Sequence, residues 1–199
     1  MNSVKTLFAA AFALALAAPS FAQTSQQDQT KETQRDVNQQ QRIENGLKSG
    51  QLSTREAGRL EREENAVDRM QTRAAANGSV SPAEQRRINA AQNRVSGDIY
   101  REKHNVVGGN PNSASSQRMQ ADVQRNVNQE GRINQGVRSG ALTTREAGAL
   151  EHGQARTDRM EANAAASGHV GPREQRAIQR SENRSNRGIH RKKRNAAQR

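Results

Sequence analysis

An internal repeat constrains this chain more than any other feature. Residues 34–105 align with residues 124–195 at a constant offset of 90 positions and without a gap, and 37 of the 72 aligned positions are identical. The clearest shared block, Ser49–Gly58, returns as Ser139–Gly148. An ungapped match of this length indicates a duplicated structural unit, so the fold of one copy should describe both.

Each copy contains signals for three helices. In the first copy, Gly50 is placed to end a helix over residues 34–48, because a left-handed C-cap favours glycine. Ser53 and Ser81 are each followed three residues later by glutamate, which is the capping-box pattern that begins a helix. Apolar residues recur along these segments at three-, four- and seven-residue spacing. We therefore predict an all-α protein of tandem, duplicated three-helix units with up-down-up topology.

The rest of the chain is short and polar, apart from its first residues. The predicted organisation is a signal peptide (1–22), a disordered segment (23–33), a first helical repeat (34–105), a flexible Gly/Asn/Ser linker with a helix lead-in (106–123), a second helical repeat (124–195) and a tail (196–199).

The first 22 residues have the pattern of a secretory signal. Lys5 precedes an apolar run, Leu7–Ala18, which Pro19 ends, and small residues stand at Ser20 and Ala22. Twelve apolar residues are too few to span a bilayer, which needs about 20. The expected location is therefore the periplasm or the medium, with no integral membrane segment after cleavage.

Large apolar side chains are scarce in the remaining 177 residues. Leu, Ile and Val contribute 21 of them, Tyr100 is the single aromatic residue, and cysteine is absent. Such a chain lacks the apolar walls of a typical enzyme pocket, and it carries no nucleophile-elbow, P-loop or dinucleotide-binding motif. We therefore expect no enzymatic activity and no cofactor. A thin core also predicts marginal stability unless the two copies pack together or the chain self-associates.

One segment resembles a known family. The string from Arg42 to Glu56, R-I-x-x-G-x-x-S-G-x-L-x-T-x-E, is similar to a repeat of uncharacterised exported proteins of proteobacteria. The resemblance covers both copies and implies an exported helical protein, without an activity.

A second pattern matches half of a calcium-binding loop. The spacing G-x-(L/V)-x-x-x-E is similar to the second half of an EF-hand loop, and it occurs at Gly50–Glu56, Gly78–Glu84, Gly140–Glu146 and Gly168–Glu174. The first half of each loop lacks carboxylates, and helix capping explains the same residues. The four histidines do not have metal-ligand spacing. We therefore predict no metal site.

Charge distinguishes the two copies. Lysines and arginines exceed acidic residues by three in residues 34–105 and by eight in residues 124–195. The excess of the second copy gathers in its last helix, where arginines recur at three- and four-residue spacing. The candidate polyanion-binding residues are Arg176, Arg180, Arg184, Arg187, Arg191, Lys192, Lys193 and Arg194.

This basic stripe carries the functional hypothesis. Arginine suits phosphate and carboxylate, so an exported, non-enzymatic protein that binds an anionic partner is predicted: nucleic acid, phosphorylated envelope lipid or another acidic polymer, or an anionic membrane surface. A solvated surface face would explain the same charges. Two alternatives stay open: a structural, self-associating envelope protein that forms homo-oligomers, and a periplasmic metal-binding or stress-resistance protein with degenerate EF-hand-like loops.

The signal sequence gives a direct prediction. Cleavage should follow Ala22, because Ser20 and Ala22 satisfy the small-residue rule of the peptidase. Mass spectrometry of the exported protein should find Gln23 at its N-terminus. An intact Met1 would contradict export.

Overall fold

The computed structural model describes residues 20–195, with side chains from Gln26 onward, and this part of the chain is all-helical. Residues 1–19 of the predicted signal peptide and the tail at 196–199 lie outside it. Its elements are α1 (Ser20–Ser49), α2 (Thr54–Ala74), the 3₁₀ turn η1 (Ala75–Asn77), α3 (Pro82–Lys103), α4 (Ala114–Arg138), α5 (Thr144–Ala165) and α6 (Pro172–Asn195). No helix among these residues is long and apolar enough to cross a membrane. The all-α prediction is confirmed.

The predicted caps form the helix ends. At α2, the Ser53 hydroxyl accepts from the Glu56 amide, while a Glu56 carboxylate oxygen accepts from the Ser53 amide at 2.8 Å. The second copy has the same arrangement between Thr143 and Glu146. Gly50 has a φ of 75°, the left-handed conformation expected after α1. Local signals therefore fix where most helices begin and end.

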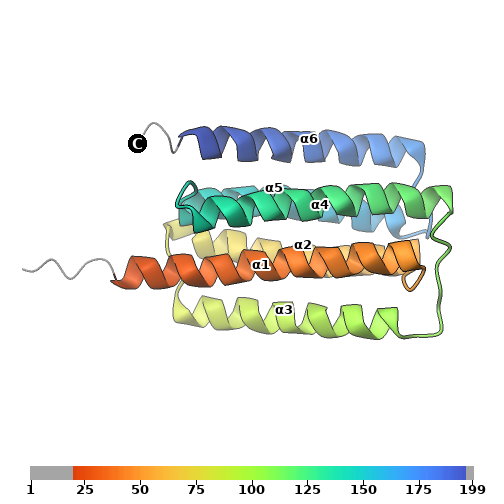
Figure 1. Ribbon diagram of the computed structural model, residues 1–199, viewed down its shortest axis with the longest axis horizontal. Helices are drawn as coiled ribbons and strands as arrows, with labels where there is room; N and C mark the ends of the chain where they lie inside the picture. The colour runs from red at the N-terminus through yellow and green to blue at the C-terminus, as the bar shows by residue number, and fades with distance from the viewer. Residues whose placement is uncertain (1–19, 196–199) are drawn as a thin grey trace, which may run out of the picture.

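The two copies interlock instead of forming separate bundles. Helix α2 packs along α5, and α1 packs along α4, while α3 and α6 cover opposite edges (Figure 1). Both central pairs are antiparallel: Gly58 near the start of α2 faces Ala165 at the end of α5, and the Gln26 side chain near the start of α1 donates to the Val137 carbonyl at 2.7 Å. This packing between copies supplies the buried surface that one copy lacks.

A close approach of α2 and α5 depends on two equivalent glycines. A Cβ atom on Gly58 would overlap the Cβ of Ala165, and one on Gly148 would overlap the Cβ of Ala75. Each contact joins one copy to the other, and the 90-residue offset of the repeat relates the two contacts. Glycine therefore lets the two backbones come together at both ends of the pair.

The segment 23–33, predicted to be disordered, belongs to α1 instead. Its side chains Gln29, Glu32 and Thr33 are buried. The Asn134 amide of α4 donates to the Thr30 carbonyl and to the Thr33 hydroxyl, each at 2.8 Å. Hydrogen bonds to α4 thus order a segment whose composition alone suggests disorder.

The linker between the copies also has partners. The Gly109 amide donates to the Gly50 carbonyl at 2.8 Å, and just before the linker the Asn105 side chain donates to Glu56 at 2.9 Å. The segment therefore lies against the α1–α2 turn, and α4 begins at Ala114, within the predicted lead-in.

The glycine contacts predict opposite effects for two substitutions. Gly58→Val should lower the free energy of unfolding by about 1–3 kcal/mol, because the added side chain overpacks the α2–α5 contact. Gly131→Ala should raise it by about 0.5–1 kcal/mol, because a Cβ there meets nothing within 4 Å and alanine favours the helix. Urea denaturation measures both. An unchanged midpoint for Gly58→Val would contradict the close approach.

Candidate metal centre

The interior of this protein is acidic. Thirteen aspartate or glutamate side chains are buried among the described residues, and no lysine or arginine there is buried to the same degree. Buried carboxylates are rare unless they are paired, and ion pairs involve only three of the thirteen, Glu44, Glu56 and Glu182. The thirteen are Glu32, Asp36, Glu44, Glu56, Glu61, Glu64, Asp68, Asp122, Glu130, Glu151, Asp158, Glu161 and Glu182.

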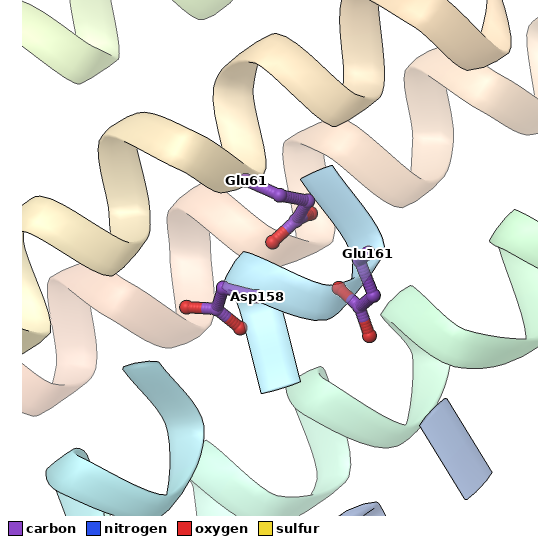
Figure 2. Close-up of side chains that lie close together, drawn as sticks. All are labelled: Glu61, Asp158 and Glu161. Atoms are coloured by element: carbon purple, nitrogen blue, oxygen red, sulfur yellow. The ribbon is translucent and has the colours of Figure 1, made fainter. Parts of the chain in front are cut away.

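Three of these carboxylates converge from α2 and α5. Glu61 of α2 and Asp158 and Glu161 of α5 each place one oxygen within 4.8 Å of the others, and all three side chains are at most 2% exposed (Figure 2). Asp158 and Glu161 lie three residues apart on one helical face, and Glu61 faces them from the antiparallel helix. We call this group the Glu61 cluster.

A second group, the Asp68 cluster, consists of Asp68 of α2, Glu130 of α4 and Glu151 of α5, whose oxygens also lie within 4.8 Å of one another. The two clusters are related by the repeat. Glu151 is the counterpart of Glu61, and Asp68 is the counterpart of Asp158. An approximate two-fold axis between α2 and α5 therefore exchanges the clusters.

The clusters differ in their third carboxylate. Glu161 stands where the first copy has Gln71, and Glu130 stands where it has Gln40. Each cluster thus gains one acid from the second copy. The duplicated framework is shared, but the ligand sets of the two clusters are not identical.

The clusters meet at the axis. The Asn65 side chain donates to the carbonyl of Ala155, its own counterpart, which places this axis near the middle of α2 and α5. Burial raises the pKa of Asp68 well above its ordinary value, and the charge and hydrogen bonding of Asp158 raise it further. The six carboxylates therefore form one connected array rather than two isolated pockets.

Neutral amides support the carboxylates but leave several oxygens without a partner. Asn126 donates to Glu161 at 2.9 Å and to Asp158 at 3.3 Å, and Gln40 donates to Glu61 at 2.9 Å. The buried oxygens without a hydrogen-bond partner in the clusters are Glu61 Oε1, Glu161 Oε1, Asp68 Oδ2, Glu130 Oε2 and both oxygens of Glu151. An array of buried acceptors that lacks donors needs either protons or cations.

The pKa values of the acidic interior follow from its burial. Burial raises the pKa of Glu61 to about 7, although the Gln40 hydrogen bond opposes the shift. The pKa values of Glu151, Asp158 and Glu161 rise well above the ordinary range, first by burial and then by neighbouring carboxylates. The fold thus favours either a protonated array or one that is neutralised by bound cations.

The EF-hand-like loops do not supply these groups. Glu56, Glu84 and Glu146 accept hydrogen bonds from the amides of their N-cap residues, and Glu174 accepts from the Gly171 amide at 2.7 Å. The four glutamates of the pattern therefore act as helix caps. All four histidines, His104, His152, His169 and His190, are exposed and belong to neither cluster.

Sequence reasoning predicted no metal site and missed the carboxylate array. A usable signal exists in the repeat. Glu61 and Asp68 lie seven residues apart, hence on one helical face, and Glu151 and Asp158 preserve both acids at the same spacing. Acids retained on one face of a duplicated helix point to a shared interior role.

The predicted basic stripe lies on the outer face of α6. Arg176, Arg180, Arg184, Arg187, Arg191 and Arg194 are exposed, whereas Lys192 and Lys193 are half-buried. Lys193 turns toward α4, where it donates to Gln135 at 2.9 Å. The stripe is therefore continuous through its arginines, and Lys193 is partly used by the fold.

Comparison of the chain with protein-family models, with curated proteins and with solved structures gives no match. The resemblance to exported repeat proteins, export itself and the absence of enzymatic activity stay predictions.

The raised pKa values predict an unusual dependence of stability on pH. Burial raises the pKa of Asp122 to about 7 and those of Glu32 and Glu182 to about 8, so the folded protein holds protons that the unfolded chain has released. Stability is then greatest below about pH 4 and falls as pH rises to about 8. Melting followed by circular dichroism in EDTA should show a falling Tm over this range. A Tm that rises from pH 4 to 8 would contradict the protonated interior.

Proposed function

We propose that this protein binds hard metal cations in the Glu61 and Asp68 clusters. The observation that carries the proposal is the convergence of three fully buried carboxylates in each cluster, with oxygens that have no other partner. Ordinary structural carboxylates lie at the surface or pair with a base. These six do neither.

Electrostatics favours a cation in such an array. Like charges at these separations repel strongly in an interior of low dielectric, and a bound divalent ion becomes the largest local charge and reverses that repulsion. Protons compete for the same oxygens, so binding should release protons and strengthen as pH rises. The raised pKa values thus describe the metal-free state of the same site.

The donor set indicates the class of cation. The clusters offer carboxylate oxygens. Gln40 and Asn126 already donate hydrogen bonds to these carboxylates, and their buried amide oxygens have no hydrogen-bond partner. Oxygen ligands suit Ca²⁺, Mn²⁺ and Mg²⁺, and no thiolate or imidazole is present to select a softer ion. Because Mg²⁺ retains several waters, a buried array favours Ca²⁺ or Mn²⁺.

Each cluster draws ligands from both copies. Glu61 comes from the first copy and Asp158 and Glu161 from the second, whereas Asp68 comes from the first and Glu130 and Glu151 from the second. A cation in either cluster would therefore bridge α2 to α5 and hold the two copies together. Metal binding should stabilise the folded state by mass action.

Calorimetric titration tests the proposal. EDTA-treated, dialysed protein at pH 7.5 should bind two Ca²⁺ or Mn²⁺ ions per chain, release protons and gain Tm. Glu161→Gln installs the residue that the first copy has at Gln71, so it should fold, and it should lose one of the two ions or weaken its binding by about 10–100-fold.

The matched control is Glu84→Gln, which keeps a capping-box residue but removes a carboxylate from an EF-hand-like loop. It should leave the stoichiometry and affinity unchanged. The proposal fails if millimolar Ca²⁺ and Mn²⁺ give neither binding heat nor a rise in Tm, or if Glu161→Gln binds both ions as the parent does.

A further inference from the structure

A basic groove lies between α5 and α6, away from the carboxylate clusters. It is lined by His152 and Arg156 of α5 and by Arg184, Arg191 and Lys192 of α6, with Gly188 among them. Both arginines of α6 in this group also belong to the exposed stripe. The groove therefore borders the stripe at these two arginines.

At three positions that line this groove, the first copy has acidic residues instead. Glu63, Asp98 and Glu102 of the first copy correspond to Gly153, Gly188 and Lys192 of the second. Two of these acids form ion pairs in the first copy: Asp98 pairs with Arg101, and Glu102 lies 3.6 Å from Arg59.

One of these two cations, Arg101, is retained in the second copy as Arg191, whereas Arg59 is replaced by Ala149. Arg94, on the same helix as Arg101, is also retained, as Arg184. Two acids have become glycines and the third has become lysine. The second copy thus keeps Arg184 and Arg191, lacks the three nearby acids of the first copy and frees the space that two of those acidic side chains would fill.

The acids of α6 do not neutralise the stripe. Glu174 caps its own helix through the Gly171 amide, and Glu182 is buried against Arg125 of α4 at 3.2 Å. Between residues 26 and 195, no ion pair involves a stripe arginine. Their positive charge is available to a ligand.

We infer that the groove and the arginine stripe bind a linear chain of phosphates, with one phosphate seated in the groove against Arg184 and Arg191. Arginine's planar fork matches phosphate oxygens, and the missing Cβ at Gly188 permits a close approach. The stripe spans 19 residues, Arg176–Arg194, or about 28 Å of helix, so it can follow several successive phosphates. This inference does not depend on the metal clusters.

The surface of α6 favours a phosphate chain over a membrane or a base-specific ligand. The exposed large apolar side chains of the described residues are Tyr100, Val106 and Val107, none of them on α6, whose Ile178 and Ile189 are buried. Insertion into lipid needs an exposed apolar face, and base stacking needs aromatic rings. A linear chain of phosphates is the ligand that fits this surface, and both the backbone of a nucleic acid and inorganic polyphosphate provide one.

Fluorescence anisotropy in EDTA tests the inference. The probe is a labelled single-stranded oligonucleotide of mixed sequence, with inorganic polyphosphate as the competitor. Binding should be independent of sequence, be displaced by polyphosphate and weaken linearly with salt on a log–log plot. Arg184→Glu should weaken it by about tenfold or more at low salt and reduce the salt slope.

Two variants make the test specific. Arg94→Glu places the same charge reversal at the equivalent position of the first copy and should change affinity by less than about threefold. Gly188→Asp restores the acid of the first copy and should weaken binding while keeping helicity, because an added Cβ meets Leu150 at an ordinary 3.5 Å and aspartate suits a helix better than glycine.

Three results would overturn the inference. The first is equal weakening by Arg94→Glu and Arg184→Glu, which would mean that net charge alone drives binding. The second is unchanged binding of the oligonucleotide by Arg184→Glu. The third is tighter binding of phosphatidylglycerol vesicles than of polyphosphate in the same buffer, which would assign the stripe to a membrane surface.

Discussion

The contact between α2 and α5 brings carboxylates together in the middle of the protein. The stability of the fold depends on whether these carboxylates are ionised or neutralised. Gly58 and Gly148 let the two backbones approach closely, and the acids between these contacts are buried from solvent. An ionised carboxylate in such a place is costly unless a proton or a cation neutralises it. Because large apolar side chains are few, burial of apolar surface cannot offset many unneutralised charges.

The repeat explains the geometry of the clusters. Each cluster takes carboxylates from both copies, so a single three-helix unit would contain only part of either one. Two identical copies around a two-fold axis would form two identical clusters. Joining the copies in one chain allows the clusters to differ, as they do where Gln40 and Gln71 correspond to Glu130 and Glu161.

Local signals in the sequence predict the helices but not what they bury. Capping boxes such as Ser53–Glu56 and the left-handed Gly50 depend on neighbouring residues, so the helix boundaries near them were correct. The prediction failed for residues 23–33 and for the carboxylate array, because contacts distant in the sequence bury the carboxylates and three side chains of that segment, Gln29, Glu32 and Thr33. A hydropathy pattern treats polar side chains as exposed, whereas here glutamines and asparagines bridge helices.

The fold also separates charge between the inside and the outside of the molecule. Thirteen of the twenty acidic residues are buried, so seven remain to face the thirty lysines and arginines within the described part of the chain. The formal charge of +12 therefore understates how basic the exterior is. A chain with a thin apolar core can thus place acids inside, where protons or cations neutralise them, and present arginines outside, where a phosphate-bearing partner can do so. On this view the interior cation sites and the α6 surface are two consequences of one segregation of charge.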